Sequence, residues 1–352
     1  MQLEKLLRDR DIAFVVTTAD TGSMGAPRLG KNLVTRSIKQ MNKDQVMDWH
    51  NFYPLHVIYS FLSSLEQQYP SRCTVHCIGY TVEGREIKML KISSSHAGNS
   101  GAWLDGAIHA REWISAAVVT YIAHHLATHF DALPESVTNK DWYLVPVLNP
   151  DGYVHTHVND RMWRKNRARH DNKIVGVDLN RNFGPSINSR GEGASVDPNH
   201  LNYRGPAPFS EPETAALRDT ILNSVVPFKL FLTFHAFSEA IAFPWGATHE
   251  PCPDYVPLLE GATVMAKAIE QTSGRLYKVG AFKDIMYRAE GTSIDWSYGT
   301  AFIPFSYLIE LRSKQHKFLL PNDEIEETCK EILSGVLALA EHVDKQTCVN
   351  LK

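Results

Sequence analysis

The run Leu104-Asp-Gly-Ala-Ile-His-Ala-Arg-Glu-Trp113 determines how the rest of this chain is interpreted. It joins an apolar stretch, 103–108, which has the composition of a short buried strand, to a segment, 114–126, which has the apolar spacing of a helix. His109 and Glu112 lie at the junction, three residues apart. An imidazole nitrogen and a carboxylate are preferred zinc ligands, and a catalytic zinc has three protein ligands. The run therefore predicts two of the three.

The His-x-x-Glu spacing alone is weak support for a metal site. The chain has 16 histidines and 39 acidic residues, so the same spacing also arises on solvated helix faces. A third ligand is expected at another strand end, because α/β folds place their sites at the carboxyl ends of strands. Leu230-Phe-Leu-Thr-Phe-His235 is a largely apolar run that ends in a histidine. A lone histidine there is usually a hydrogen-bonded core residue, but together with His109 and Glu112 it completes a zinc site.

Composition limits the class of protein. At 352 residues, with 43% hydrophobic and 21% charged residues, the chain has the material for one large globular core. A net charge of -3 provides no basic surface for nucleic acid or for an anionic membrane, and no stretch reaches the roughly 18 to 20 apolar residues that span a bilayer. We therefore expect neither nucleic acid nor a membrane as a partner. The five cysteines leave the redox compartment open.

Strand-like and helix-like segments alternate from about residue 50 onward. Expected strands are 74–78, 87–92, 103–108, 141–148, 230–235 and 306–311, and expected helices are 53–69, 114–130, 212–224, 254–271 and 323–344. This alternation predicts an α/β fold with a mixed, mostly parallel twisted central sheet flanked by helices on both faces. The longest irregular piece is 150–209, and a loop of that length is usually functional.

Seven separated motifs make the chain resemble the zinc metallocarboxypeptidases, the family typified by pancreatic carboxypeptidases A and B, with the A type the most similar. The resemblance covers about residues 50–345. The motifs are Gly106-Ala-Ile-His-Ala-Arg-Glu-Trp113, Asn149-Pro-Asp-Gly-Tyr153, Met162-Trp-Arg-Lys-Asn-Arg167, Gly176-Val-Asp-Leu-Asn-Arg-Asn-Phe183, Phe234-His235, Ser293-Ile-Asp-Trp-Ser-Tyr298 and Ile309-Glu-Leu-Arg312. It implies a carboxypeptidase-like fold and hydrolysis of the C-terminal peptide bond of peptides and proteins.

The resemblance also implies the reactive groups. His109, Glu112 and His235 would hold one Zn²⁺, which lowers the pKa of a bound water and acts as a Lewis acid. Glu310 matches the family's general base, and it lies on an apolar strand where an unpaired charge is costly. The alternative for Glu310 is an ion pair with Arg312. A catalytically silent homologue that only binds peptides is the alternative for the whole chain.

Substrate recognition is implied by further motif positions. Arg181, beside Asn180, matches the clamp for the terminal carboxylate, a task that suits the bidentate guanidinium. Arg167 matches the residue that polarises the scissile carbonyl. Tyr287 matches a mobile tyrosine that closes over the bound C-terminus. Two residues match outer subsites, although a surface ion pair is an equal alternative for the first of them: Arg111 and Phe318.

The residue before Asp-Trp in the Ser-x-Asp-Trp motif selects the terminal side chain in this family. An acid there selects Lys and Arg, whereas an apolar residue selects aliphatic and aromatic side chains. The residue is Ile294 in this chain. Because burying a lysine ammonium without a counter-charge is costly, we expect the A-type preference for apolar C-terminal residues.

The first 42 residues resemble the tail of the family's inhibitory pro-segment and its activation linker, which leaves 43–352 as the catalytic domain. Arg36 or Lys39 is the expected cleavage point for an activating trypsin-like protease. The N-terminal residues lack the apolar core of a signal peptide. We expect a truncated form of a secreted, extracellular zymogen that is monomeric, and a cytosolic active form is the competing interpretation.

Overall fold

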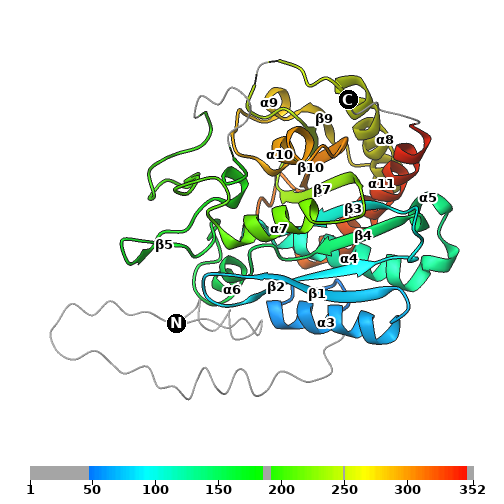
Figure 1. The fold of residues 1–352 in the computed structure, drawn as a ribbon, viewed down its shortest axis with the longest axis horizontal. Coiled ribbons are helices and arrows are strands. Elements are labelled where there is room, and N and C mark those ends of the chain that lie inside the picture. The colour runs from blue at the N-terminus through cyan, green and yellow to red at the C-terminus, as the bar shows by residue number, and fades with distance from the viewer. Residues whose placement is uncertain (1–46, 185–191, 249, 347–352) are drawn as a thin grey trace, which may run out of the picture. The chain divides into compact units, whose positions relative to one another are not determined.

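The computed structural model describes residues 47–184, 192–248 and 250–346. The predicted pro-segment remnant, 1–42, lies outside these ranges. In the described residues, the main sheet has eight strands in the order β1-β2-β4-β3-β7-β10-β8-β9 (Figure 1). They are β1 (Cys73–Tyr80), β2 (Glu86–Ile92), β3 (Ser100–Asp105), β4 (Lys140–Val145), β7 (Phe228–Ala236), β8 (Ala240–Phe243), β9 (Lys278–Ala281) and β10 (Phe305–Leu311). A small hairpin, β5 (Arg169–His170) with β6 (Lys173–Ile174), is separate.

The sheet is mixed, with parallel strands at its centre. The pairs β4–β3, β3–β7 and β7–β10 are parallel, as is β8–β9. The pairs β1–β2, β2–β4 and β10–β8 are antiparallel. The predicted mixed, mostly parallel sheet is confirmed. The parallel centre brings the carboxyl ends of β3, β7 and β10 to the same edge.

Helices cover both faces of this sheet (Figure 1). Successive strand residues point to opposite faces, so Leu230 and Leu232 belong to one buried cluster and Phe231 to the other. The larger cluster includes residues of α3 (Leu55–Gln68), α4 (Trp113–His129), α8 (Tyr255–Ser273) and α11 (Ile325–Lys345). The smaller includes residues of α7 (Pro212–Leu222), α9 (Phe282–Ile285) and α10 (Ser293–Gly299). The remaining short elements are α5 (Glu135–Thr138), α6 (Pro150–Val158), η1 (Phe130–Ala132), η2 (Leu179–Arg181) and η3 (Asn322–Glu324).

The strand expected at 103–108 ends three residues early, at Asp105. Gly106 explains the change. A Cβ at this position would lie 2.7 Å from the backbone oxygen of Ser115, so only glycine allows the first turn of α4 to approach the strand end this closely. The chain then turns through Ala107, whose φ is +48°, toward the residues of the predicted metal site.

The segment expected to be irregular, 150–209, begins with a helix, α6. Pro150 occupies its first turn, and the Asn149 side chain accepts a hydrogen bond from the Gly152 backbone N–H at 2.9 Å. Both are helix-start signals, and the prediction of a loop at this point was wrong. In the ranges that the structure covers, no helix combines the length and apolarity needed to cross a membrane.

Candidate metal centre and active site

His109, Glu112 and His235 converge at the carboxyl edge of the sheet. His109 follows β3, Glu112 immediately precedes α4, and His235 is the penultimate residue of β7. His109 Nδ1 lies 2.9 Å from Glu112 Oε1, and His235 Nδ1 lies 3.1 Å from both His109 Nδ1 and Glu112 Oε2. One ligand atom from each residue lies within 4.8 Å of the others, and all three side chains are buried. This geometry fits a single metal ion.

The protonation states of these three side chains also suit a metal ion. Burial lowers the pKa of His235 to about 4, although Glu112 acts in the opposite direction, so this imidazole is neutral near pH 7. For Glu112, burial alone would raise the pKa, but His109 and His235 outweigh it and hold the pKa below its usual range. Neutral imidazole and ionised carboxylate are the forms that bind a metal. With two nitrogens and one carboxylate, the donor set is one that zinc prefers.

His109 is oriented from behind by Asp178, which the sequence analysis did not identify. His109 Nε2 lies 3.1 Å from Asp178 Oδ1, while Arg164 donates to Asp178 Oδ2 from Nε at 3.2 Å and from Nη2 at 2.9 Å. Burial would raise the pKa of Asp178, but Arg164 and then Arg181 and His109 hold it well below the usual range. A carboxylate behind a metal-binding histidine fixes its orientation and raises its basicity. Its position in the Gly176–Phe183 motif, two residues before Asn180, was the available signal.

Glu310 lies opposite His235 in the parallel register between β10 and β7. Its side chain is partly accessible through a cavity of about 150 Å³. Burial of the carboxyl raises its pKa to about 8, and nearby Glu112 adds to the increase. The alternative ion pair with Arg312 is not formed, because Arg312 donates to Glu331 of α11. The cavity is lined by His109, Glu112, Arg164, Asn180, His235, Ala236, Phe237, Ser238, Phe282, Met286, Tyr287, Leu308, Glu310 and Phe318.

The expectation for Arg167 requires a correction. Its guanidinium stacks over Trp163 at 4.8 Å and its Nε lies 3.4 Å from Glu83, in a different cavity from the three ligands. Arg164, three residues earlier in the same motif, lines the cavity with the ligands and lies 3.9 Å from Glu112 Oε1. The sequence contains three arginines between 161 and 167, and the motif alone did not show which one faces the metal.

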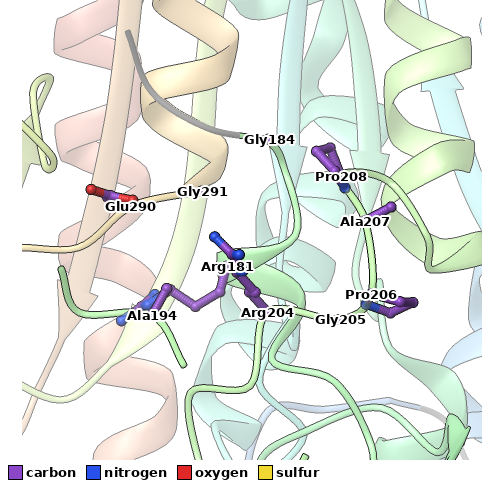
Figure 2. A pocket seen from close by; sticks show the side chains of 10 residues that line it. All are labelled: Arg181, Gly184, Ala194, Arg204, Gly205, Pro206, Ala207, Pro208, Glu290 and Gly291. Carbon is purple, nitrogen blue, oxygen red and sulfur yellow. The ribbon is translucent and has the colours of Figure 1, made fainter. Parts of the chain in front are cut away.

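Asn180 and Arg181 are neighbours in the chain, but only Asn180 lines the cavity that holds the metal ligands. Asn180 lines the metal-site cavity, and its Oδ1 accepts from the Ser293 backbone N–H at 2.8 Å, which anchors the start of α10. Arg181 Nη2 lies 3.2 Å from the Tyr287 hydroxyl, and Tyr287 lines the cavity with an exposed fraction of 46%. Arg181 itself lines an adjoining cavity of about 260 Å³ (Figure 2). The other lining residues are Gly184, Ala194, Arg204, Gly205, Pro206, Ala207, Pro208, Glu290 and Gly291.

Of the predicted specificity and outer-subsite residues, only Phe318 lines the cavity of the metal ligands, whereas Ile294 and Arg111 contact residues of its wall or lie in the same apolar cluster as one. Ile294 is fully buried in the apolar cluster that contains Leu308, a residue of the cavity wall. Phe318 also lines the cavity, and the Arg111 guanidinium stacks on its ring at 4.0 Å. Arg111 Nη1 additionally donates to the Met162 carbonyl at 3.4 Å, and no ion pair of Arg111 is present among the described residues. The surface ion pair considered for Arg111 is therefore not formed in that part of the chain.

Comparison with known proteins agrees with this site. A family model described as zinc carboxypeptidase matches residues 58–335. Crayfish (Astacus astacus) carboxypeptidase B is 36% identical over 84% of this chain and 98% of its own length, and bovine (Bos taurus) carboxypeptidase O is 35% identical over 85% and 80%. The solved structure of carboxypeptidase A from Helicoverpa armigera superposes with a TM-score of 0.79 at 28% identity, covering 98% of this chain and 86% of that one. The chain belongs to the zinc carboxypeptidase family.

Proposed function

We propose that this protein is an active zinc-dependent carboxypeptidase that removes apolar residues from the C-termini of peptides and proteins. The observation that carries the proposal is that the three metal ligands and Glu310 share one cavity. A zinc ion held by His109, Glu112 and His235 would polarise a carbonyl oxygen and lower the pKa of a water molecule to about 7. Proton transfer, stabilisation of the oxyanion and binding of the substrate are proposed for the side chains around the ion.

Glu310 is the proposed proton carrier. Its carboxylate takes a proton from the attacking water and later delivers it to the departing amine. The pKa of about 8, raised by burial, makes the carboxyl a better proton acceptor than an exposed glutamate, and a divalent cation beside it would bring that pKa down again. Arg164, not Arg167, is placed to stabilise the oxyanion, because its fixed positive charge reaches the same cavity.

Arg181 and Asn180 are the proposed partners of the terminal carboxylate. Arg181 Nη2 now contacts the Tyr287 hydroxyl, and a substrate carboxylate would compete for that donor. Tyr287 would turn over the bound C-terminus, which its exposed position allows. Together these contacts would restrict cleavage to the last peptide bond. Arg111 and Phe318 would contact residues further from the terminus.

The preference for apolar termini rests on Ile294 and the buried cluster around it, which includes Ala242, Ala289 and Leu308. Relatives of this chain carry the names carboxypeptidase B and carboxypeptidase O as well, so family membership alone leaves the preference open. The side chains of that cluster are apolar and would offer a lysine or arginine side chain no counter-charge, which favours aliphatic and aromatic ones.

A peptide-release assay tests the proposal. Three peptides that differ only in the last residue, Phe, Leu or Lys, are incubated with the purified protein, with and without a metal chelator. Release of Phe and Leu should exceed release of Lys, and the chelator should abolish it. A protein that binds zinc and peptide but releases no terminal residue would be the silent homologue instead. Release of Lys alone would overturn the A-type preference.

The proposal extends to the setting in which the enzyme works. The resemblance of residues 1–42 to a pro-segment supports secretion as a zymogen that a trypsin-like protease activates, and the proposed enzyme is a monomer that acts on free C-termini. Those residues lie outside the described part of the structure. Activity that rises after brief trypsin treatment, together with cleavage at Arg36 or Lys39 identified by N-terminal sequencing, would support this. Full activity without any cleavage would contradict it.

A further inference from the structure

A buried chain of hydrogen bonds leads from His235 into the core of the sheet. His235 Nε2 lies 3.2 Å from Thr233 Oγ1, and Thr233 Oγ1 donates to Asp105 Oδ1 at 2.8 Å. Asp105 Oδ2 accepts from Trp103 Nε1, also at 2.8 Å. Thr233, Asp105 and Trp103 have no exposed surface. None of these three residues lines the cavity where the reaction is proposed to occur.

The register of the sheet builds this chain. Asp105 and Thr233 are partners on the parallel strands β3 and β7. Thr233 and His235 are two residues apart on β7, so their side chains project from the same face. Asp105 is the last residue of β3, and His109 follows four residues later. The carboxyl edge that carries the metal ligands therefore has a second layer of polar groups directly behind it.

The direction of the hydrogen bonds determines which ring nitrogen of His235 keeps its lone pair and can bind a metal. Trp103 Nε1 can only donate, and Asp105, whose pKa burial raises to about 7, can only accept once it is ionised above that pH. The single hydroxyl proton of Thr233 is then used by Asp105, so Thr233 Oγ1 must accept from His235 Nε2–H. With the proton on Nε2, the lone pair is on Nδ1, the atom that lies 3.1 Å from both His109 Nδ1 and Glu112 Oε2.

We propose that Asp105 and Thr233 are positioning residues for the metal: through this chain they hold His235 in the tautomer that presents Nδ1 to zinc. The inference rests on the assignment of His235 as a zinc ligand. His109 is oriented differently, by direct contact of its Nε2 with the Asp178 carboxylate. Each histidine is thus oriented by a different carboxylate, and the carboxylate that orients His235 acts through the neutral hydroxyl of Thr233. Outer groups of this kind typically change metal affinity by about 10- to 100-fold.

Substitutions of Thr233 separate a hydrogen-bond effect from a packing effect. Thr233→Val keeps the shape and removes the hydroxyl, whereas Thr233→Ser keeps the hydroxyl and removes a methyl group. Thr120→Val is the matched control, because Thr120 is also fully buried and hydrogen-bonded but lies in α4 and contacts Trp49 and the Ala117 carbonyl. The zinc dissociation constant is measured by competition with a chromophoric chelator at about pH 8, where Asp105 is ionised, and folding is checked by circular dichroism.

Zinc should bind about 10- to 100-fold more weakly to Thr233→Val than to the unmodified protein, and within about threefold of it for Thr233→Ser and Thr120→Val. Unchanged affinity in Thr233→Val would overturn the proposal, as would equal losses in Thr233→Val and Thr233→Ser. If Thr233→Val does not fold, the two separate variants Thr233→Ser and Asp105→Asn decide the matter: the proposal requires near-unchanged zinc affinity in the first and weaker affinity in the second.

Asp105→Asn tests the direction of the chain. The new amide donates to Thr233, whose hydroxyl proton then turns to His235 Nε2 and forces the ring proton onto Nδ1. Zinc affinity should fall at least as far as in Thr233→Val, and the visible spectrum of the cobalt-substituted protein should shift. Unaltered affinity and spectrum would overturn the proposal. Because these readouts need no peptide cleavage, an unmodified protein that binds zinc but hydrolyses nothing would refute the proposed function and leave this inference standing.

Discussion

Arg164 and Arg167 are three positions apart in the chain and have opposite surroundings. Arg164 is buried against Asp178 beside the metal ligands, whereas Arg167 lies over Trp163 and contacts Glu83. Arg164→Lys keeps the charge but loses the planar fork, so kcat/KM should fall by roughly tenfold or more. Arg167→Lys should stay within about twofold of the unmodified protein. Steady-state kinetics on one Phe-terminated peptide makes the comparison, and the reverse ranking would restore Arg167 to the role first expected of it.

Glu310→Gln isolates proton transfer from metal binding. Glutamine has nearly the same shape but accepts no proton, so kcat should fall by about 10²- to 10⁴-fold. Glu310 is not one of the three ligands, so zinc content measured by atomic absorption should stay at one per chain. Hydrolysis by Glu310→Gln at the unmodified rate would show that another group carries the proton.

Ile294 is the residue at which the terminal side chain is proposed to be selected. Ile294→Asp places a carboxylate in an otherwise apolar cluster, and the ratio of kcat/KM for Lys over Phe termini should rise by roughly 100-fold, since the buried ammonium then has a counter-charge. Ile294→Val, which keeps the cluster apolar, should leave the ratio nearly unchanged. If both variants retain the original ratio, another residue around the substrate cavity selects the terminal side chain.

At the residue level, the sequence motifs predicted the three residues that form the metal site, but not the groups behind them, and the role of Glu310 stays a prediction. Ligands carry their chemistry in their own side chains and stand in recognisable runs. Asp178, Arg164 and Thr233 contact residues between 2 and 128 positions away, and sheet register and loop packing decide those contacts. A single sequence does not contain that geometry in any local pattern.

Among the elements, the long amphipathic and buried segments were predicted well and the short ones were not. The five expected helices all form, with ends within two residues of the prediction, because their apolar spacing extends over three or more turns. The strands β8 and β9 have four residues each, which is too short for a period to be recognised. β3 was expected to be longer because Gly106–Ile108 continues its apolar composition, but composition does not reveal the close approach of α4.

Helix α11 closes one face of the sheet by packing on α8, and this contact should contribute much of its stability. Leu339 is fully buried in α11. Leu339→Ala should lower the free energy of unfolding by about 2 to 5 kcal/mol through the lost burial and the cavity left behind. Urea denaturation followed by circular dichroism measures the change. Glu341→Ala, at an exposed position of the same helix, is the control and should change it by less than about 0.5 kcal/mol.

For the molecule as a whole, one buried acid should make stability depend on pH. Glu213, in α7, is fully buried; its Oε2 accepts from Asn166 Nδ2 at 3.1 Å, while Oε1 has no hydrogen-bond partner in the structure. Burial raises its pKa to about 8, and the charge of Glu211 adds to the increase. The folded protein therefore keeps this proton up to about pH 8, whereas the unfolded chain loses it near pH 4.5. Rising pH between these values favours the unfolded state.

Glu213→Gln removes this ionisation. The free energy of unfolding of the variant, minus that of the unmodified protein, should increase by up to about 1.4 kcal/mol per pH unit between pH 5 and pH 8. Urea denaturation at pH 5, 6.5 and 8 measures the difference. Glu135→Gln, at an exposed position, is the control for the loss of a glutamate elsewhere in the chain. Parallel pH curves for Glu213→Gln and the unmodified protein would mean that Glu213 is already ionised at pH 5 in the folded state.

Glu310 and His235 are partners on adjacent parallel strands. The spacing between these two residues and the shape of the cavity wall can therefore change independently in evolution. Their spacing is fixed by the backbone ladder between β7 and β10, which no exchange of loop residues disturbs. The walls that would meet the substrate, by contrast, come from segments after the strands, such as those carrying Phe237 and Tyr287. Parts of the cavity wall can therefore change by loop substitution while the spacing of Glu310 and His235 stays the same. That division offers a physical reason why members of one family can carry the different names A, B and O.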